Sequence, residues 1–462
     1  MKRATMWAAA ITLLGACTET SVPDLNNISS STISAGLNRS TVQLLVTGLL
    51  ARDRALLGSG YILFAETMAR DLYRIDPSNP SFITQLLGSS IDPGGVIGAS
   101  AWGGFWVGIR AANNIIDNVA TARDLTAAEK AGTIGLAMTI KAQNYYRALE
   151  MRDSLGIPIA VDQPLSAPPA PFVCKANVLS YVSALLDSGY TSLQAAGATP
   201  FAFRLPGGFS LAGDYSTPAT FIAYNRGLKG KVELYRGLDH AKPNLASFSV
   251  AISALTQAIG SLDKSRINNS VYHIYSTADG DDTNPLVDVT VHLNPAVGDS
   301  IQSGDLRAAK IVAGVGPFSG SSVRTTYNMA YTLPNNPDNL TRPIPVLTIA
   351  ELVLLRAQAR IETGDLAGAT ADINFIHVNA GGLAPYPTFV SAASARNAVL
   401  YEKRYSLLFE SAHRLVDLRA YSRMNAAFLK KERADDIFQS VLPVPQAEVN
   451  GRGGVPPVLV CS

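Results

Sequence analysis

Apolar residues recur at steps of three and four along most of the chain, the spacing that places them on one face of an α-helix. Polar residues fill the positions between them, so each segment predicts an amphipathic helix with one buried face. The segments are residues 40–57, 106–122, 128–153, 178–197, 218–238, 246–262, 348–364, 366–382 and 394–424. The sequence therefore predicts a mostly α-helical protein.

Residues 272–345 follow a different pattern. They are rich in Gly, Pro, Asn, Thr and aromatic residues, and the helical spacing is lost. Because Gly and Pro interrupt regular structure, this composition predicts an irregular, loop-rich insertion with short β-strands.

Several predicted helices follow one another in pairs. Within residues 351–377, one helix ends at Gly364, and Asp365 begins a tight turn into the next. The small residues Ala357 and Ala369 fall where two antiparallel helices must approach closely, as they do in tetratricopeptide repeats. Less regular pairs join residues 142–151 to 178–195 and residues 223–237 to 245–259.

The first residues predict an export signal. Lys2 and Arg3 precede an uncharged stretch, and the sequence Leu14-Gly15-Ala16 leads directly to Cys17. The apolar run is about ten residues long, whereas a helix that spans a bilayer needs roughly twenty. The four residues that end at the cysteine resemble the lipobox of bacterial lipoproteins, in which Cys17 would carry acyl chains such as palmitate. The alternative is a secretory signal with a chance cysteine.

These observations give a domain plan. We predict a lipoprotein signal peptide at residues 1–16, a lipidated Cys17 with a flexible tether over residues 17–40, and one helical domain over residues 41–462, with its loop-rich segment at about 272–345. The tether is predicted because its residues are polar, rich in Ser and Asn, and almost without periodicity.

Charge and cysteine content narrow the choice of partners. The net charge of the 462-residue chain is only +2, without the excess of Lys and Arg that nucleic-acid binding requires. After Cys17, the remaining cysteines are Cys174 and Cys461. Since disulfides persist in exported proteins, we predict that these two pair. The alternative is two separate buried thiols, because the sequence cannot show that they come close.

The sequence contains no recognised catalytic or metal-binding motif. The five histidines are scattered, without a pair at metal-ligand spacing, and there is no nucleophile elbow. No cofactor is predicted. A carboxylate pair for glycoside hydrolysis stays open, because such residues meet in space rather than along the chain. The segment DGDDTN at residues 279–284 offers oxygen ligands for calcium, but it lacks EF-hand spacing, which favours a solvated turn.

Aromatic residues in the loops are the candidates for ligand binding. A rigid ring can stack on the apolar face of a sugar at low entropic cost, while polar neighbours bind its hydroxyl groups. Tyr73, Tyr275 and Tyr327 are favoured because Gly- and Pro-rich loops carry function more often than helix faces do. Trp102 is a weaker candidate, since with Trp106 it forms a helical stripe typical of core packing. Other loop aromatics are Phe82, Tyr272 and Tyr331.

Charged residues near the C-terminus are interpreted as architecture. The spacing of Glu410, Arg414 and Asp417 predicts ion pairs along one helix, which need no substrate to explain them. Glu402 and His413 belong to the same group.

Several segments, in order along the chain, resemble the SusD/RagB family of outer-membrane nutrient-binding lipoproteins. They are WGGFWVGIRAANNII at residues 102–116, KAQNYYRALEMRDSLGIPI at 141–159, the helix pair and its flanks at 343–382, YEKRYSLLFESAHRLVDLR at 401–419 and VLPVPQAEVN at 441–450. Ser411 departs from the family pattern, which usually has Gly there.

The resemblance implies a right-handed superhelical scaffold of tetratricopeptide-like helix pairs, with a loop-rich insertion and short β-strands. It also implies a protein held at the outer membrane by its lipid anchor and exposed on the cell surface. Such a protein would bind a glycan or a peptide and deliver it, as a lid without bond chemistry, to a SusC-like TonB-dependent barrel. Two other hypotheses stay open: a surface enzyme acting on an oligosaccharide or peptide, and a helical-repeat scaffold for protein contacts.

Overall fold

The computed structural model describes residues 36–88, 90–164, 166–314, 323, 325–459 and 461. The predicted signal peptide, Cys17 and residues 18–35 of the tether lie outside the described residues. The first described helix, α3 (Arg39–Ala55), begins after Asn38, whose side chain accepts a hydrogen bond from the backbone N–H of Thr41. The threonine hydroxyl in turn accepts from the Asn38 N–H, so this capping box starts the helix one residue before the predicted helical segment 40–57 and two residues before the predicted start of the domain.

Helices dominate the described part of the chain, as the apolar spacing predicted. None of them combines the length and the apolar character that crossing a bilayer requires. The further α-helices are α4 (Tyr61–Met68), α5 (Ser81–Ile83), α6 (Val96–Ala99), α7 (Gly103–Asn118), α8 (Ala127–Arg152), α9 (Lys175–Ala196), α10 (Pro218–Gly237), α11 (Ala246–Ile259), α12 (Pro295–Asp299), α13 (Ile349–Glu362), α14 (Leu366–Asn379), α15 (Ala392–Ser406), α16 (His413–Ala420) and α17 (Gln446–Gly451).

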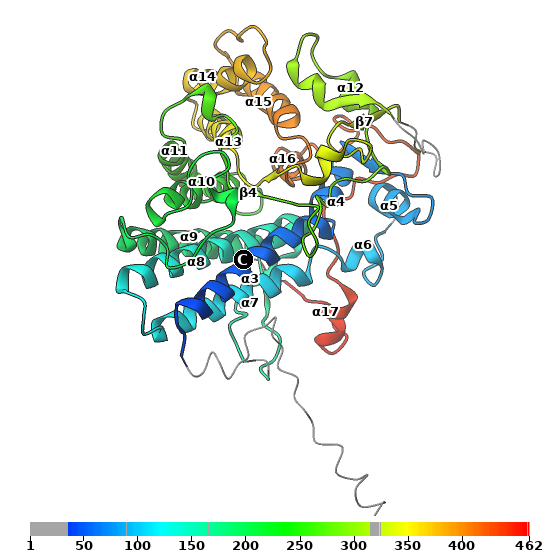
Figure 1. Cartoon of the computed structure of the whole chain (residues 1–462). Coiled ribbons are helices and arrows are strands. Elements are labelled where there is room, and N and C mark those ends of the chain that lie inside the picture. Colours follow the sequence, from blue (N-terminus) through cyan, green and yellow to red (C-terminus); the bar gives the residue numbers. More distant parts are fainter. Residues whose placement is uncertain are drawn as a thin grey trace, which may run out of the picture.

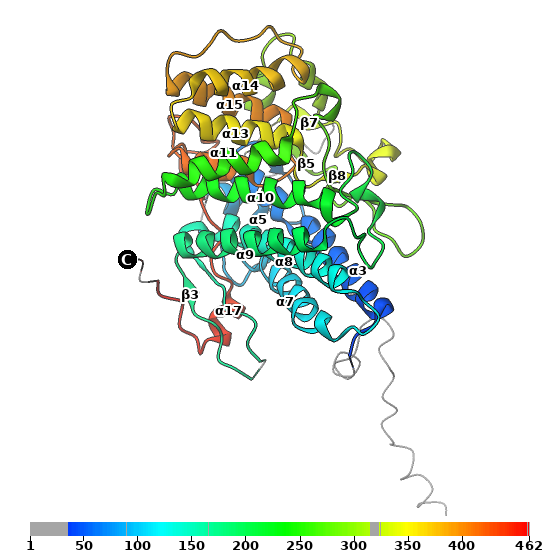
Figure 2. The same ribbon diagram turned by 90° about the vertical axis from the view of Figure 1, so that its left-hand side faces the viewer.

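Successive helices pack as pairs: α8 with α9, α10 with α11, and α13 with α14. Figure 2 shows them as successive layers, from α14 and α13 through α11 and α10 to α9, α8 and α7. The last pair joins where Gly364 adopts a φ of 81°, a left-handed conformation that glycine tolerates at a helix end. The fold-class prediction of tetratricopeptide-like helix pairs with short strands is confirmed.

Small residues bring α10 and α11 together. A Cβ atom on Gly230 would lie 2.3 Å from Cγ of Leu255, and one on Gly237 would lie 2.4 Å from the ring of Phe248. Since both neighbours are buried, glycine at these two positions lets the helix axes approach more closely than any larger residue would allow.

Short strands lie beside the helical stack (Figure 1). The antiparallel sheet has the order β1-β5-β7-β6, with β1 (Leu72–Arg74), β5 (Val291–Leu293), β7 (Tyr327–Met329) and β6 (Ile311–Ala313). In its register Arg74 lies opposite Val291. Two further antiparallel pairs are β2 (Ile157–Pro158) with β3 (Phe172–Val173), and β4 (Tyr272–His273) with β8 (Ile344–Pro345).

The predicted helical pattern over residues 394–424 is wrong in its middle. Helix α15 ends at Ser406 and α16 begins at His413, and Phe409 between them has a φ of 63°. An L-residue in this region cannot continue a right-handed helix. Residues 407–409 are all buried, so the turn places consecutive apolar side chains in the core rather than on a helical stripe.

The break also changes the predicted ion pairs. Arg414 pairs with Asp71 at 2.8 Å, and Asp417 pairs with Lys403 at 2.6 Å. Glu410 precedes α16, so it is not one helical turn from Arg414 as the sequence spacing suggested. The ion-pair partners of Arg414 and Asp417 therefore come from other elements than the sequence spacing suggested.

Cys174 and Cys461 form a disulfide, with their Cα atoms 5.7 Å apart. Cys174 is the residue that precedes α9, so the bond joins the C-terminal segment to the start of that helix. The two positions are separated by 287 residues, a distance over which spacing in the sequence gives no sign of contact.

Candidate functional site

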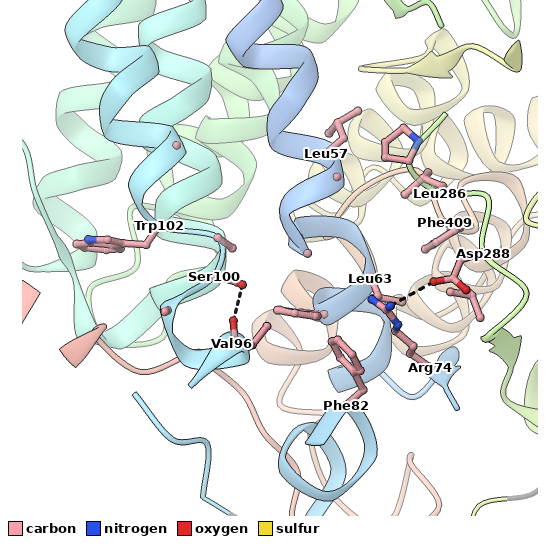
Figure 3. A pocket seen from close by; sticks show the side chains of 18 of the residues that line it. Leu57, Leu63, Arg74, Phe82, Val96, Ser100, Trp102, Leu286, Asp288 and Phe409 are labelled. Atoms are coloured by element: carbon pink, nitrogen blue, oxygen red, sulfur yellow. Dashed lines mark hydrogen bonds and ion pairs between the residues drawn. The ribbon is translucent and has the colours of Figure 1, made fainter. Parts of the chain in front are cut away.

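A pocket of about 360 Å³ lies where α4, β1, α6 and the start of α7 meet the loop that leads into β5 (Figure 3). Its size falls within the range of small-molecule sites. The labelled lining residues are Leu57, Leu63, Arg74, Phe82, Val96, Ser100, Trp102, Leu286, Asp288 and Phe409.

Strand alternation decides which side chain of β1 faces the pocket. Successive residues of a strand point to opposite faces of a sheet, so Tyr73 and Arg74 diverge. The tyrosine enters a small separate core with Ile75 and Ile83, whereas the arginine lines the pocket.

Arg74 is the charged centre of the pocket. Its guanidinium lies 4.1 Å from the ring centroid of Phe82, in cation–π contact, and the side chain is 28% exposed. The nearest carboxylate oxygens belong to Asp288 at 3.4 Å and Asp76 at 3.5 Å, both longer than a good hydrogen bond. Among the described residues, Nε of Arg74 has no hydrogen-bond partner. Because Nε is buried, the donors that remain for a ligand oxygen are the Nη groups at the end of the side chain, whose ion pairs are long.

Asp288 supplies the complementary acceptor. Its Oδ1 accepts hydrogen bonds from the backbone N–H of Thr290 at 2.8 Å and from its hydroxyl at 2.7 Å, which fixes the carboxylate. Its Oδ2 is the oxygen turned toward Arg74 (Figure 3). A donor and an acceptor side by side suit a ligand with neighbouring hydroxyl groups, each of which can both give and accept a hydrogen bond.

Apolar side chains form the rest of the wall. Leu57, Leu63 and Phe64 come from the segment around α4, and Leu286 comes from the opposite loop. The backbone approaches closely here, because a Cβ on Gly58 would lie 2.9 Å from Pro285. The result is a mostly apolar hollow with a few convergent polar groups, the usual composition of a small-molecule site.

Two lining residues have strained backbones. Ala101 has a φ of 49° and Phe409 a φ of 63°, both in the left-handed region that costs an L-residue about 1 kcal/mol or more. Both are buried, and both line the pocket. Such strain persists only where the surrounding packing holds it, and it concentrates at binding and catalytic sites.

The predicted tyrosines do not line this pocket. Tyr73 is 1% exposed, and its hydroxyl donates to Glu432 and accepts from Nδ2 of Asn294 at 2.6 Å. Burial is the main reason why its pKa is raised. Because its ring is enclosed, Tyr73 cannot offer a stacking face to a ligand in this structure.

Tyr275 and Tyr327 also lie elsewhere. Tyr275 is 7% exposed, and the guanidinium of Arg54 sits 5.6 Å from its ring centroid. Tyr327 is half-buried in β7, where its hydroxyl donates to Asp299 at 3.3 Å. These contacts hold both rings within the protein, so they do not form a shared platform.

Trp102 is the predicted candidate that the pocket does include. Its ring stacks on Phe172 at 5.8 Å and meets Trp106 edge-on at 4.8 Å, which leaves the residue 7% exposed. Figure 3 shows its ring directed away from Phe82 and Arg74. Core packing therefore explains the ring, and the residue contributes to the wall where α7 begins.

Behind Trp102 lies Arg152, which is fully buried at the end of α8. Its guanidinium is 5.0 Å from the tryptophan ring centroid, and Nη2 donates to the Ser100 carbonyl at 3.2 Å. Burial lowers the pKa of this arginine to about 9. The cation supports the backbone of residues 100–102 from inside the protein.

The segment at residues 279–284 does not gather a metal site. Arg54 pairs with Asp281 at 2.7 Å and with Asp282 at 3.5 Å. Within the described ranges, no three His, Cys, Asp or Glu side chains come close enough to hold a metal ion.

The residues that make the pocket polar, Arg74 and Asp288, were not singled out from the sequence. One signal was present: in the segment Leu72–Ile75 the apolar residues surround a single arginine, and alternation turns it away from Tyr73. Nothing in the sequence pattern links this arginine to an aspartate more than two hundred positions later.

Comparison of sequences finds no match: neither a protein-family model nor a curated protein matches this chain. Solved structures, however, share its fold. A SusD superfamily protein from Bacteroides fragilis has a TM-score of 0.69 and 16% identity, covering 92% of this chain and 98% of its own.

Two other similar structures carry descriptions of binding. Surface glycan-binding protein A from Bacteroides thetaiotaomicron has a TM-score of 0.67 and 13% identity, covering 89% of this chain and 97% of its own. A putative sugar binding protein from Bacteroides vulgatus has a TM-score of 0.65 and 14% identity, covering 91% and 98%. The fold predicted from the sequence segments is therefore the one that the structure has.

Proposed function

We propose that this chain, which has the SusD-like fold, is a nutrient-binding lipoprotein of the cell surface. It binds a glycan, or a peptide, in the pocket around Arg74 and delivers it to a SusC-like TonB-dependent transporter in the outer membrane. It acts by capture and transfer, without breaking bonds in the ligand. Cys17 anchors the protein, and residues 18–35 connect the anchor to the folded body.

One observation carries the binding proposal: the pairing of Arg74 with Asp288 inside a mostly apolar pocket. The long 3.4 Å separation leaves the guanidinium and the carboxylate available to hydroxyl groups of a ligand. The apolar wall suits the C–H faces of a sugar ring. Two similar structures are described as a surface glycan-binding protein and a putative sugar binding protein, which supports a glycan as the ligand class.

The binding proposal is tested with the full-length protein in mild detergent. A panel of oligosaccharides and peptides is screened, and the affinity of the best ligand is measured by calorimetry for the wild type, Arg74→Gln and Asp288→Asn. Loss of one charge-assisted hydrogen bond is expected to weaken binding about ten-fold or more. Arg123→Gln, which removes an exposed arginine elsewhere, is the matched control and is expected to bind as the wild type does.

Two results would contradict it. Binding that both pocket variants leave unchanged would place the ligand site elsewhere. Turnover of the ligand, seen as cleavage products by mass spectrometry and abolished by one carboxylate substitution, would show an enzyme rather than a binding protein.

The transport proposal is tested on native membranes. The protein is extracted in mild detergent and purified through a C-terminal tag, and its companions are identified by mass spectrometry. A stoichiometric TonB-dependent barrel is the expected result. Its absence, together with full ligand binding, would leave a free-standing binding lipoprotein.

A further inference from the structure

A second pocket lies between α15 and α16 and has a volume of about 200 Å³. It shares no lining residue with the pocket around Arg74. Figure 1 shows α15 in the upper part of the view and α16 near its middle beside α4, with α7 below both. Its cationic lining residues are Lys403, Arg404, Arg414 and Arg423.

Carboxylates balance only part of this charge. Lys403 pairs with Asp417 at 2.6 Å. Arg404 and Arg414 both pair with Asp71, at 2.7 and 2.8 Å, so two guanidinium groups share one carboxylate. These three cations are therefore balanced by only two carboxylates, which leaves the pocket with a net positive charge.

Arg423 adds to that excess. Its Nη2 donates to Oδ1 of Asn397 at 2.6 Å, and the carboxylate whose charge acts on it, Asp417, already pairs with Lys403. The residue is only partly exposed, and this burial is the main reason why its pKa is lowered. An anion that enters the pocket would replace the water that such a cation lacks.

The other titratable groups do not cancel the excess. Glu66 is buried beneath Arg404 and Arg414, and burial together with Asp71 raises its pKa well above the ordinary value, which favours the uncharged acid. His413 lines the pocket, and burial lowers its pKa well below the ordinary value, so its imidazole is neutral. Neither group changes the sign of the pocket.

An aromatic ring forms the outer wall. Phe428 is 53% exposed, and the guanidinium of Arg423 lies 4.8 Å from its ring centroid. The contact orders the ring at the rim of the pocket, where it can meet an apolar face of a ligand. The volume is below the usual range for drug-sized ligands, which suits a molecule about the size of one sugar ring.

We propose that this pocket binds a small carboxylate-bearing molecule about one ring in size, of the uronic acid class. Arg423 donates charge-assisted hydrogen bonds to the carboxylate, in the planar geometry that suits guanidinium groups. The positive charge left over at Arg404 and Arg414 attracts the same group, and Phe428 contacts the ring. The proposal goes beyond the nutrient site and does not depend on it, because the residues of the two pockets are separate.

The test uses isothermal titration calorimetry on the full-length protein in detergent. The probes are D-galacturonate, D-galactose, which has the same ring without the carboxylate, and inorganic phosphate. Galacturonate is expected to bind at least ten-fold more tightly than galactose, and more weakly as sodium chloride screens the charge. Binding of galactose with equal affinity, or of phosphate alone, would overturn the proposal.

Variants locate the binding. Arg423→Gln is expected to weaken galacturonate at least ten-fold, and Phe428→Ala several-fold, whereas the control Arg123→Gln keeps the wild-type affinity. Both positions are partly or largely exposed, and circular dichroism melting verifies that each variant is folded. Galacturonate binding that Arg423→Gln leaves unchanged would show that the anion binds elsewhere and would refute the assignment.

Discussion

Asp71 connects distant parts of the chain, and its removal gives a sharp test of the ion network. The Asp71 carboxylate is fully buried. Its Oδ1 accepts hydrogen bonds from Nε and Nη2 of Arg404 at 3.0 and 2.7 Å. Its Oδ2 forms an ion pair with Nε of Arg414 at 2.8 Å. Asp71→Asn keeps the shape of the side chain but removes its charge. Both arginines would then lose their shared counter-ion.

The size of the effect follows from burial. Breaking a buried ion pair by removing one partner costs about 3–5 kcal/mol. The arginine side chains are 12% and 16% exposed, so water recovers part of this cost. Glu66 recovers another part, because the loss of the Asp71 charge lowers its pKa and lets it ionise beside the same arginines. We expect Asp71→Asn to lower the free energy of unfolding by about 2–3 kcal/mol.

Urea denaturation at neutral pH, followed by circular dichroism, measures this free energy for the wild type, Asp71→Asn, Glu66→Gln and the double variant. Glu66 compensates only in the absence of Asp71. The loss in free energy of unfolding is therefore expected to be larger for the double variant than the sum of the losses of the two single variants. The control Asp282→Asn, whose carboxylate is 78% exposed and 3.5 Å from its arginine, should change stability by less than about 0.5 kcal/mol. Strict additivity, or a loss below about 1 kcal/mol for Asp71→Asn, would refute the reasoning.

Three further predictions concern stability. His413 has a lowered pKa in the folded state, so its contribution is complete above the unfolded value near 6.5 and is lost as the pH falls below it. Between about pH 7.5 and 5.5 the wild type should lose about 1.4 kcal/mol of its free energy of unfolding through this group. In His413→Gln, the difference between the free energies of unfolding measured in urea at these two pH values should be smaller by that amount. Gly230→Ala would place a Cβ 2.3 Å from a buried leucine of α11 and should lower the free energy of unfolding by about 1–3 kcal/mol. Gly48→Ala, whose Cβ would have no atom within 4 Å, should instead raise it by about 0.5–1 kcal/mol. Equal effects of the two variants in urea denaturation would contradict the packing argument. Replacing Cys174 and Cys461 together by Ser should lower the free energy of unfolding by about 2–5 kcal/mol. An unchanged midpoint of urea denaturation would show that the disulfide restrains only the C-terminal segment.

The helical framework could be predicted because its signal is local. A helix repeats every 3.6 residues, so a run of about fifteen residues is enough to reveal its buried face. The close approach of paired helices was visible in the same way, from small residues beside a Gly364-Asp365 turn. The sequence also predicted the short strands of residues 272–345, since Gly, Pro and Asn act on the backbone at the positions where they stand.

The polar centre of the pocket was decided only by the tertiary structure. Tyr73 and Arg74 are adjacent in the sequence, and only the sheet determines that the first is enclosed and the second lines a pocket. Asp288 comes from a loop far along the chain, and its distance from the arginine depends on how that loop packs over α4.

The same distinction holds for the charges near the C-terminus. Spacing along the chain predicted that Arg414 pairs within its own helix, but its partner Asp71 lies on a segment more than three hundred residues earlier. Local periodicity determines which face of an element is buried. The ion-pair partner of a buried charge is determined by the packing of distant elements, which must bring the two groups within about 3 Å. The sequence by itself therefore determined most of the helices and their pairing, and only the tertiary structure determined the break between α15 and α16 and which side chains meet to form the two pockets.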